Sequence, residues 1–301
     1  MNRIVPGFFS QLRNSLIVWI LFVSVACANP NQTKRLKLIK AYEVQTNHSM
    51  EPSGLTEWNG EFFTVSDKHN YIYQLIFNQD TISLNPIIEI HNDKWLNLDL
   101  EGITHDETNF YLISEMHSQI LKVSKDGSNQ SWMPKNSQLK NKAQAVGLLQ
   151  TFNAFFEGIC LLNNHEFLLV AERQPRGFVI FNKDTNEIQA YQKDTGVFSY
   201  KNHRSPDFSG LSCDDGLYVL DRNAYVVAEL VIKDGQFQQG IGYSYQHIIK
   251  NPKFQYQDMR YGHAEGLVVK GDRVFIILDN NRNSHQQDSD NYNSMFFELK
   301  K

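Results

Sequence analysis

Residues 99–103 read Asp99-Leu100-Glu101-Gly102-Ile103, and a phrase of this kind occurs five times along the chain. Each copy places a Ser or Glu before a Gly and an aliphatic residue after it. The copies begin at Ser53, Glu101, Glu157, Ser209 and Glu265, and their glycines are separated by 48, 56, 52 and 56 residues. Repeats of this period that each contain several short strands are typical of propeller blades and of solenoid units.

Every copy is followed by a polar turn and then by a strand-like run that ends in an acid. The runs cover 62–65, 110–113, 167–170, 217–220 and 274–277, and the acids are Asp67, Glu115, Glu172, Asp221 and Asp279. A third apolar segment comes next in each unit, as in Tyr71 to Phe77. Short strands, frequent turn residues and almost no helical period favour an all-β propeller over a solenoid.

The two ends of the chain predict how the ring closes. The fifth unit lacks a fourth strand after Met295 to Leu299, while residues 36–45 form a strand-like run without a unit of its own. Pairing these two segments would close the ring and cover its open edges. Five phrases and one shared strand predict five blades. The alternative is a sixth, degenerate blade within 128–153 or 240–262.

The N-terminus predicts export. Arg3 and Arg13 form a basic region ahead of an apolar run, Leu16 to Ala26, which is shorter than the about 20 residues that a spanning helix needs. Ala26-Cys27-Ala28 fits a signal peptidase site, which predicts a signal peptide over 1–28 and a single propeller domain over 29–301. We therefore expect a monomer in the periplasm or the medium. The alternative is a lipoprotein attached to the membrane through Cys27.

The charge of the mature chain excludes one class of partner. Removal of residues 1–28 leaves 27 basic and 33 acidic residues, a net charge of −6. No basic tract is present, and nucleic-acid binding depends on clustered Lys and Arg. We therefore expect no nucleic-acid partner.

Two cysteines, Cys160 and Cys213, remain in the predicted propeller. An oxidising compartment would allow them to pair. They follow equivalent glycines by two and three residues, an offset that can point them to opposite faces of their strands. The two interpretations are a disulfide and a pair of small buried apolar side chains.

The repeat register gathers polar side chains at one mouth of the propeller. The first strand of a blade lines the channel and the second runs back antiparallel, so the start of one and the end of the next share a rim. Ser53, Glu101, Glu157, Ser209 and Glu265 are expected to form an inner ring and the five acids an outer ring. Carboxylates crowded at an axis must take up protons or bind a cation, and oxygen ligands select Ca²⁺ outside the cytosol. The alternative is that the ring only satisfies backbone groups between blades.

Basic and titratable side chains lie close to these rings in the repeat. Lys68, Arg173, Arg222 and Arg282 would suit a small anionic ligand such as a phosphate, or each would pair with its neighbouring acid. The candidates for proton transfer or catalysis are Asp67, Glu115, Glu172, His105 and His263. The chain contains no Gly-x-Ser-x-Gly elbow, no phosphate-binding Gly-x-x-x-x-Gly-Lys and no His-Glu-x-x-His, so no standard hydrolase motif assigns a catalytic residue.

The five phrases together resemble the phytase-like family, which is also called "esterase-like activity of phytase". The matching stretches run from Ser53-Gly54-Leu55 to Leu278-Asp279-Asn280-Asn281 and span nearly all of 50–283. The chain is also similar to the SdiA-regulated propellers. This resemblance implies a β-propeller and cleavage of a phosphoric or carboxylic ester.

A further resemblance concerns the inner ring. Soluble calcium-activated nucleotidases (apyrases) are five-bladed propellers whose calcium-facing positions run Ser, Glu, Glu, Ser, Glu, the order found here. The resemblance implies Ca²⁺ at Ser53, Glu101, Glu157, Ser209 and Glu265. Their first blade carries Asp-Asp-Arg where this chain has Ser66-Asp67-Lys68, so it implies the metal site more than nucleotide hydrolysis. Two functions follow as hypotheses: a calcium-dependent phosphoesterase or esterase, and a non-catalytic binding propeller with a structural Ca²⁺.

Overall fold

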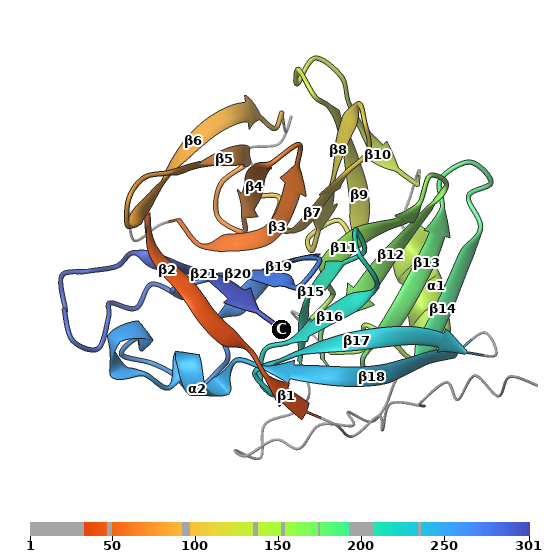
Figure 1. Cartoon of the computed structure of the whole chain (residues 1–301). Helices are drawn as coiled ribbons and strands as arrows, with labels where there is room; N and C mark the ends of the chain where they lie inside the picture. Colours follow the sequence, from red (N-terminus) through yellow and green to blue (C-terminus); the bar gives the residue numbers. More distant parts are fainter. Residues whose placement is uncertain are drawn as a thin grey trace, which may run out of the picture.

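A computed structural model describes residues 33–46, 50–91, 97–134, 138–151, 154–173, 175–192, 207–233 and 236–301. Nearly all of the regular structure in these ranges is β-strand, and the sheets surround a common centre (Figure 1). The all-β propeller expected from the sequence is confirmed. The predicted signal peptide and Cys27 lie outside the described residues.

The described strands fall into five four-stranded antiparallel units. Unit 1 contains β3 (Pro52–Trp58), β4 (Glu61–Ser66), β5 (Tyr71–Phe77) and β6 (Thr81–Glu89). Unit 2 contains β7 (Leu100–His105), β8 (Asn109–Ser114), β9 (Gln119–Ser124) and β10 (Gln130–Met133). Unit 3 contains β11 (Phe156–Asn163), β12 (Glu166–Ala171), β13 (Gly177–Asn182) and β14 (Ile188–Gln192). Unit 4 contains β15 (Phe208–Ser212), β16 (Tyr218–Asp221), β17 (Val226–Lys233) and β18 (Gln236–Ser244).

Unit 5 combines the two ends of the chain, as the sequence predicted. Its strands are β19 (Ala264–Lys270), β20 (Arg273–Leu278), β21 (Ser294–Lys300) and the N-terminal β2 (Lys37–Gln45). β2 pairs antiparallel with β21 and also parallel with β6 of unit 1, while β1 (Thr33–Arg35) pairs parallel with β18 of unit 4. The N-terminal segment therefore ties three units together.

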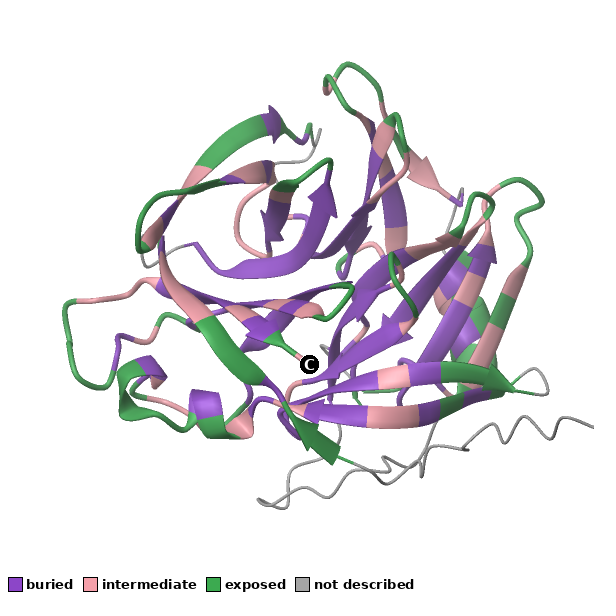
Figure 2. Cartoon of the chain, in the orientation of Figure 1, coloured by how far each residue is buried: buried purple, intermediate pink, exposed green. Residues whose placement is uncertain are grey.

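The hydrophobic core lies between the units. The inner strands β3, β7, β11, β15 and β19 contact one another in a closed ring, and each neighbouring pair of units shares one buried apolar cluster. Figure 2 shows the burial concentrated on these inner strands, with exposed residues at the outer hairpins. Burial of apolar surface between sheets is the main term that holds such a ring closed.

The two stretches that could have held a sixth blade contain helices instead. α1 (Gln138–Ala145) packs on unit 3, and α2 (Gln246–Ile249) and η1 (Pro252–Phe254) follow β18. The described part of 128–153 has one strand, β10, which is the outer strand of unit 2, and that of 240–262 has only the end of β18.

Two glycines of the repeated phrase explain why the phrase requires Gly. A Cβ on Gly54 would lie 2.6 Å from Cα of Gly102, and a Cβ on Gly210 would lie 2.7 Å from the carbonyl oxygen of Glu265. Real Cβ atoms do not approach backbone this closely, so a side chain would push the inner strands apart. The glycines therefore let the inner strands meet backbone to backbone below the mouth.

Cys160 on β11 and Cys213 after β15 form a disulfide with a Cα–Cα separation of 5.7 Å. The pair joins units 3 and 4 close to their inner strands. Of the two interpretations left open by the sequence, the structure has the disulfide. Within the described residues, no helix combines the length and apolar character needed to cross a bilayer.

Candidate metal centre at the mouth of the propeller

A β-bulge aims the repeated Ser or Glu at the mouth. In each unit the pairing between the first two strands shifts at this residue, for example between Leu100 and Gly102 or between Ala264 and Gly266. A bulge leaves one residue out of the ladder and redirects its side chain. The carboxylates of Glu101, Glu157 and Glu265 can therefore project into the mouth although their neighbours pack in the core.

The outer ring contains four acids and one arginine. The residue after the second strand donates its backbone N–H to the residue two before the Ser or Glu, and this position holds Asp67, Glu115, Glu172, Arg222 and Asp279. Asp221 was the residue predicted for unit 4, and this prediction is wrong by one residue, because Arg222 occupies the position. Asp221 pairs with Phe208, as Ser114 pairs with Leu100, and so belongs to the buried end of β16.

Asp221 instead forms a wholly buried ion pair. Its Oδ2 lies 2.7 Å from Nη1 of Arg176, and neither side chain is exposed to solvent. The Arg176 guanidinium also stacks 4.0 Å from the ring centroid of Phe208. The pair therefore links units 3 and 4 and takes no part in the mouth.

The two rings line a cavity of about 260 Å³. Among the described residues, nine carboxylates and three cationic side chains line this cavity, and the cations are Lys68, Arg173 and Arg222. The acids are Glu51, Asp67, Asp99, Glu101, Glu115, Glu157, Glu172, Glu265 and Asp279. The sequence therefore brings most of the predicted polar side chains together, with an excess of six acids.

Within this cavity the acids gather in two groups. Asp67, Asp99 and Glu101 form one, and Glu115, Glu157 and Glu172 form the other, with the ligand oxygens of each group within 4.8 Å of one another. At such separations and an effective dielectric of about 20, each pair of ionised carboxylates repels by about 3 kcal/mol. Either group could hold a metal ion, and oxygen-only donors suit a hard divalent ion.

The two serines of the inner ring donate hydrogen bonds between units. Ser209 Oγ donates to the carbonyl oxygen of Ala264 at 2.6 Å, and Ser53 Oγ donates to that of Leu100. Ser53 lines the cavity, whereas Ser209 is not among its lining residues. The two serines therefore satisfy backbone groups of the neighbouring unit, which was the alternative interpretation of the inner ring.

Several carboxylate oxygens in the mouth lack a partner. The side chains of Glu101 and Glu157 are 9% and 7% exposed, and neither makes a hydrogen bond or ion pair with the described residues. Oδ1 of Asp67 and Oε2 of Glu172 are buried and likewise accept no hydrogen bond from the described protein. Buried polar atoms without partners are rare, and here they point at a ligand that supplies positive charge.

Burial shifts the pKa values of these acids upward. It raises the pKa of Asp67 to about 7, against the pull of Lys68, and that of Glu115 to about 8. Burial, reinforced by the surrounding acids, also raises the pKa values of Glu101 and Glu157 well above the ordinary glutamate value. A bound cation would reverse these shifts because it favours the ionised form.

The predicted anion-binding residues differ in their exposure and in the number of ion pairs that they form with acids of the protein. Arg222 is fully engaged, with Nη2 2.5 Å from Oε1 of Glu172, Nε 3.0 Å from Oδ1 of Asp207 and Nη1 bonded to Glu265. Arg173 is 41% exposed and pairs only with Glu172, at 2.8 Å. Lys68 pairs with Asp67 and, at 3.1 Å, with Glu51.

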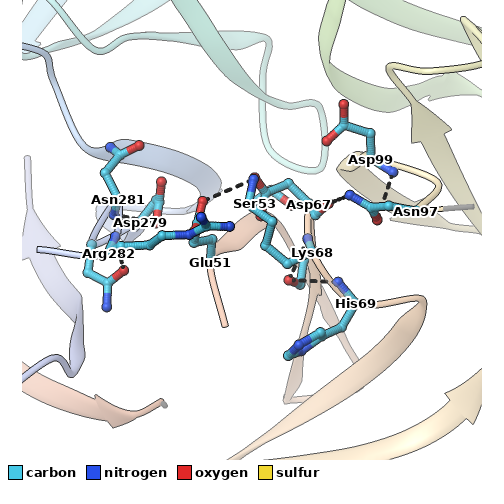
Figure 3. A network of polar contacts seen from close by, with 12 residues as sticks. Glu51, Ser53, Asp67, Lys68, His69, Asn97, Asp99, Asp279, Asn281 and Arg282 are labelled. Carbon is cyan, nitrogen blue, oxygen red and sulfur yellow. Dashed lines mark hydrogen bonds and ion pairs between the residues drawn. The ribbon is translucent and has the colours of Figure 1, made fainter. Parts of the chain in front are cut away.

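Arg282 stands at the edge of this network. Its side chain is 63% exposed, and its Nε lies 2.6 Å from Oε1 of Glu51, as Figure 3 shows. It is not a lining residue of the cavity. Arg173 is therefore the best placed of the four basic residues to meet a ligand from solvent.

The two histidines lie elsewhere than expected. His105 ends β7, so it lies at the rim opposite Glu101, where it stacks on Trp58 at 4.8 Å beside a separate cavity of about 580 Å³. Its predicted place near the mouth is wrong, because the strand length separates the two residues. His263 lies behind the mouth, with its ring nitrogens 2.8 and 2.7 Å from the carbonyl oxygens of Asp279 and Asp258. Burial lowers its pKa, and it does not line the cavity.

Sequence reasoning missed three acids of the network: Glu51, Asp99 and Asp207. Each precedes the repeated Ser or Glu by two residues, so the repeat itself contained the signal. Glu51 and Asp99 line the cavity, and Asp207 forms an ion pair with Arg222. The equivalent positions in units 3 and 5 hold Phe155 and His263, which concealed the pattern.

The family of the chain follows from a match over most of its length. Residues 51–282 match the model of the phytase-like family, described as esterase-like activity of phytase. The chain belongs to this family, as its repeats indicated. No curated protein matches its sequence.

Solved structures that resemble the chain are propeller-like proteins. Glutaminyl cyclase from Myxococcus xanthus superposes with a TM-score of 0.57 and 13% identity, covering 89% of this chain and 97% of its own. A catalytically inactive virginiamycin B lyase from Staphylococcus aureus with quinupristin gives a TM-score of 0.44 and 12% identity, covering 83% and 66%. At these identities the first likeness shows the fold alone.

Proposed function

We propose that the protein is an exported, calcium-dependent hydrolase of phosphoric or carboxylic esters, with its active site in the mouth cavity. The observation that carries the proposal is the set of buried carboxylate oxygens that have no hydrogen-bond partner among the described residues and belong to acids lining the mouth cavity. Membership of a family described by esterase-like activity supports the reaction class. The Cys160–Cys213 disulfide supports export, because disulfides persist in oxidising compartments.

Glu115, Glu157 and Glu172 would hold the calcium ion. All three are buried, and Oε2 of Glu172 has no partner among the described residues. A bound Ca²⁺ would supply Lewis-acid polarisation of the ester oxygen. Calcium is favoured over softer metals because every donor in the group is a carboxylate oxygen.

The remaining roles fall to residues around that group. Arg173, which is partly exposed and bound on one side only, would orient the anionic part of the substrate. Asp279 lines the cavity outside both acid groups, and burial raises its pKa well above the ordinary value. It would be the group that donates a proton to the leaving group.

A second function is favoured by one observation. Each cationic side chain that lines the described part of the mouth already pairs with an acid of the protein, so none of these three can bind an anion without breaking an ion pair. This arrangement suits a non-catalytic envelope propeller in which Ca²⁺ only stabilises the ring.

Turnover of p-nitrophenyl phosphate and p-nitrophenyl acetate, with Ca²⁺ and with EDTA, separates the two functions. The hydrolase predicts calcium-dependent turnover that Glu157→Gln abolishes and that Arg173→Ala weakens through KM. Glu187→Gln, an exposed acid in the β13–β14 turn, should leave turnover unchanged. A melting temperature that rises with Ca²⁺, without turnover of either ester, would establish the binding propeller instead.

A further inference from the structure

We propose that the mouth binds two divalent cations, the second held by Asp67, Asp99 and Glu101. This inference rests on the proposed calcium site at Glu115, Glu157 and Glu172 and extends it. The two groups share no residue, and each by itself brings three carboxylate oxygens within 4.8 Å. A single ion on the axis would leave one of the two groups without a counter-ion.

Partnerless oxygens occur in the second group as well as in the first. Glu101 is 9% exposed and contacts no donor among the described residues. Oδ1 of Asp67 is buried without a hydrogen-bond partner, although its other oxygen pairs with Lys68. These atoms point to a ligand at this group in its own right.

Among the described residues, the arginine with the most ion pairs in the mouth does not contact this group. Arg222 serves Glu172, Asp207 and Glu265, which belong to units 3, 4 and 5. Of the described cationic side chains, Lys68 alone forms an ion pair with the second group, and it also pairs with Glu51. Among the described residues, the nine lining acids exceed the three lining cations by six, so one divalent ion would leave most of the excess in place and two would offset four charges.

The second group is held by a short polar bridge. The Asn97 side chain donates to the carbonyl oxygen of Asp67, and its Oδ1 accepts the N–H of Asp99 at 3.3 Å (Figure 3). Asp99 has a positive φ of 53°, which Asp tolerates better than most residues. The bridge fixes units 1 and 2 relative to each other at the point where the second cation would bind.

The two acid groups adjoin, and their proximity favours one class of substrate over the other. The backbone N–H of Glu115 donates to the carbonyl oxygen of Asp99 at 2.8 Å, and both residues line the mouth cavity. Neighbouring divalent ions suit a ligand with several oxygens that can bridge them, and a phosphoryl group offers this where a carboxylic ester does not. The preferred substrate class is therefore a phosphoric ester.

Native mass spectrometry and calorimetric titration of EDTA-stripped protein with CaCl₂ count the ions directly. We expect two Ca²⁺ per chain, one in Asp99→Asn, one in Glu157→Gln and two in the control Glu187→Gln. Asp67→Asn provides a second variant of the same site, and the wild-type count stands even if a variant fails to fold. Mn²⁺ in place of Ca²⁺ should give a spin-coupled spectrum, because the two ions are neighbours.

The possible results separate this inference from the proposed function. One ion in the wild type, with no change in Asp99→Asn, overturns the second site and leaves the proposed calcium site intact. No bound ion overturns both. Two ions in Asp99→Asn would show that the second ion binds elsewhere, and uncoupled Mn²⁺ would contradict the shared substrate.

Discussion

Nη2 of Arg222 lies 2.5 Å from Oε1 of Glu172, and this ion pair crosses from unit 4 to unit 3. Arg222 occupies the outer-ring position that carries an acid in the other four units. It thereby replaces one negative charge of the ring by a positive one and neutralises one side of the mouth. Glu101 and Glu157, which have no hydrogen-bond or ion-pair partner among the described residues, are not among the acids that pair with Arg222.

Replacement of Arg222 by Met should destabilise the protein strongly. It would leave Glu172, Asp207 and Glu265 without their common partner, and loss of one member of a buried ion pair costs about 3–5 kcal/mol. Urea unfolding in EDTA measures this loss. The exposed pair of Arg260 and Asp258 gives the control, because Arg260→Ala should leave the midpoint unchanged. An Arg222→Met midpoint equal to that of Arg260→Ala would contradict the role assigned to Arg222.

A second prediction concerns the buried pair of Asp221 and Arg176. Asp221→Asn should cost about 3–5 kcal/mol of unfolding free energy, because Arg176 is left charged and wholly buried. Replacing both residues by apolar ones, as in Arg176→Met with Asp221→Leu, should recover part of the loss. Denaturant titration of the single and double variants tests this, and a double variant less stable than Asp221→Asn would refute it.

The repeat allowed the fold to be predicted from the sequence. One phrase in five copies fixed the inner strands, and the unpaired runs at 36–45 and 295–299 correctly predicted how the ends pair. The repeat did not predict correctly which residue follows the end of β16. Asp221 and Arg222 are adjacent and both polar, and only the ladder between β15 and β16 shows which of them faces the core.

Much of the candidate site depends on contacts between units that the repeat does not encode. Glu101, Glu157 and Glu265 occupy equivalent positions, yet Glu265 bonds to Arg222 while the other two have no partner among the described residues. The difference comes from a single arginine in a neighbouring unit. The division of the acids into two groups therefore depends on the three-dimensional arrangement of the units and could not be predicted from the repeat.

The disulfide offers a third prediction. Cys160 and Cys213 are separated by 53 residues, and closing a loop of this length lowers the entropy of the unfolded chain by the equivalent of about 4 kcal/mol. The Cys160→Ala, Cys213→Ala double variant should therefore unfold at lower urea concentration by about 2–4 kcal/mol. Reduction of the wild type with dithiothreitol should have a similar effect and should not affect the double variant. Equal stability of the oxidised wild type and the double variant would argue against a disulfide in solution.

The acids of the mouth should make the calcium-free protein less stable as the pH rises, and bound calcium should counteract this loss. The folded protein holds protons on Asp67 and Glu115 up to about pH 7 and 8, whereas the unfolded chain releases them near pH 4. A raised carboxyl pKa stabilises the fold fully below pH 4, and this contribution is lost as the pH rises through 7 to 8. In EDTA the melting temperature should therefore be lower at pH 8 than at pH 5.

Calcium competes with these protons, so its stabilising effect should grow over the same interval. Thermal scans at both pH values, with Ca²⁺ and with EDTA, test this. A calcium effect that is larger at pH 5 than at pH 8 would show that the ion does not bind to these carboxylates.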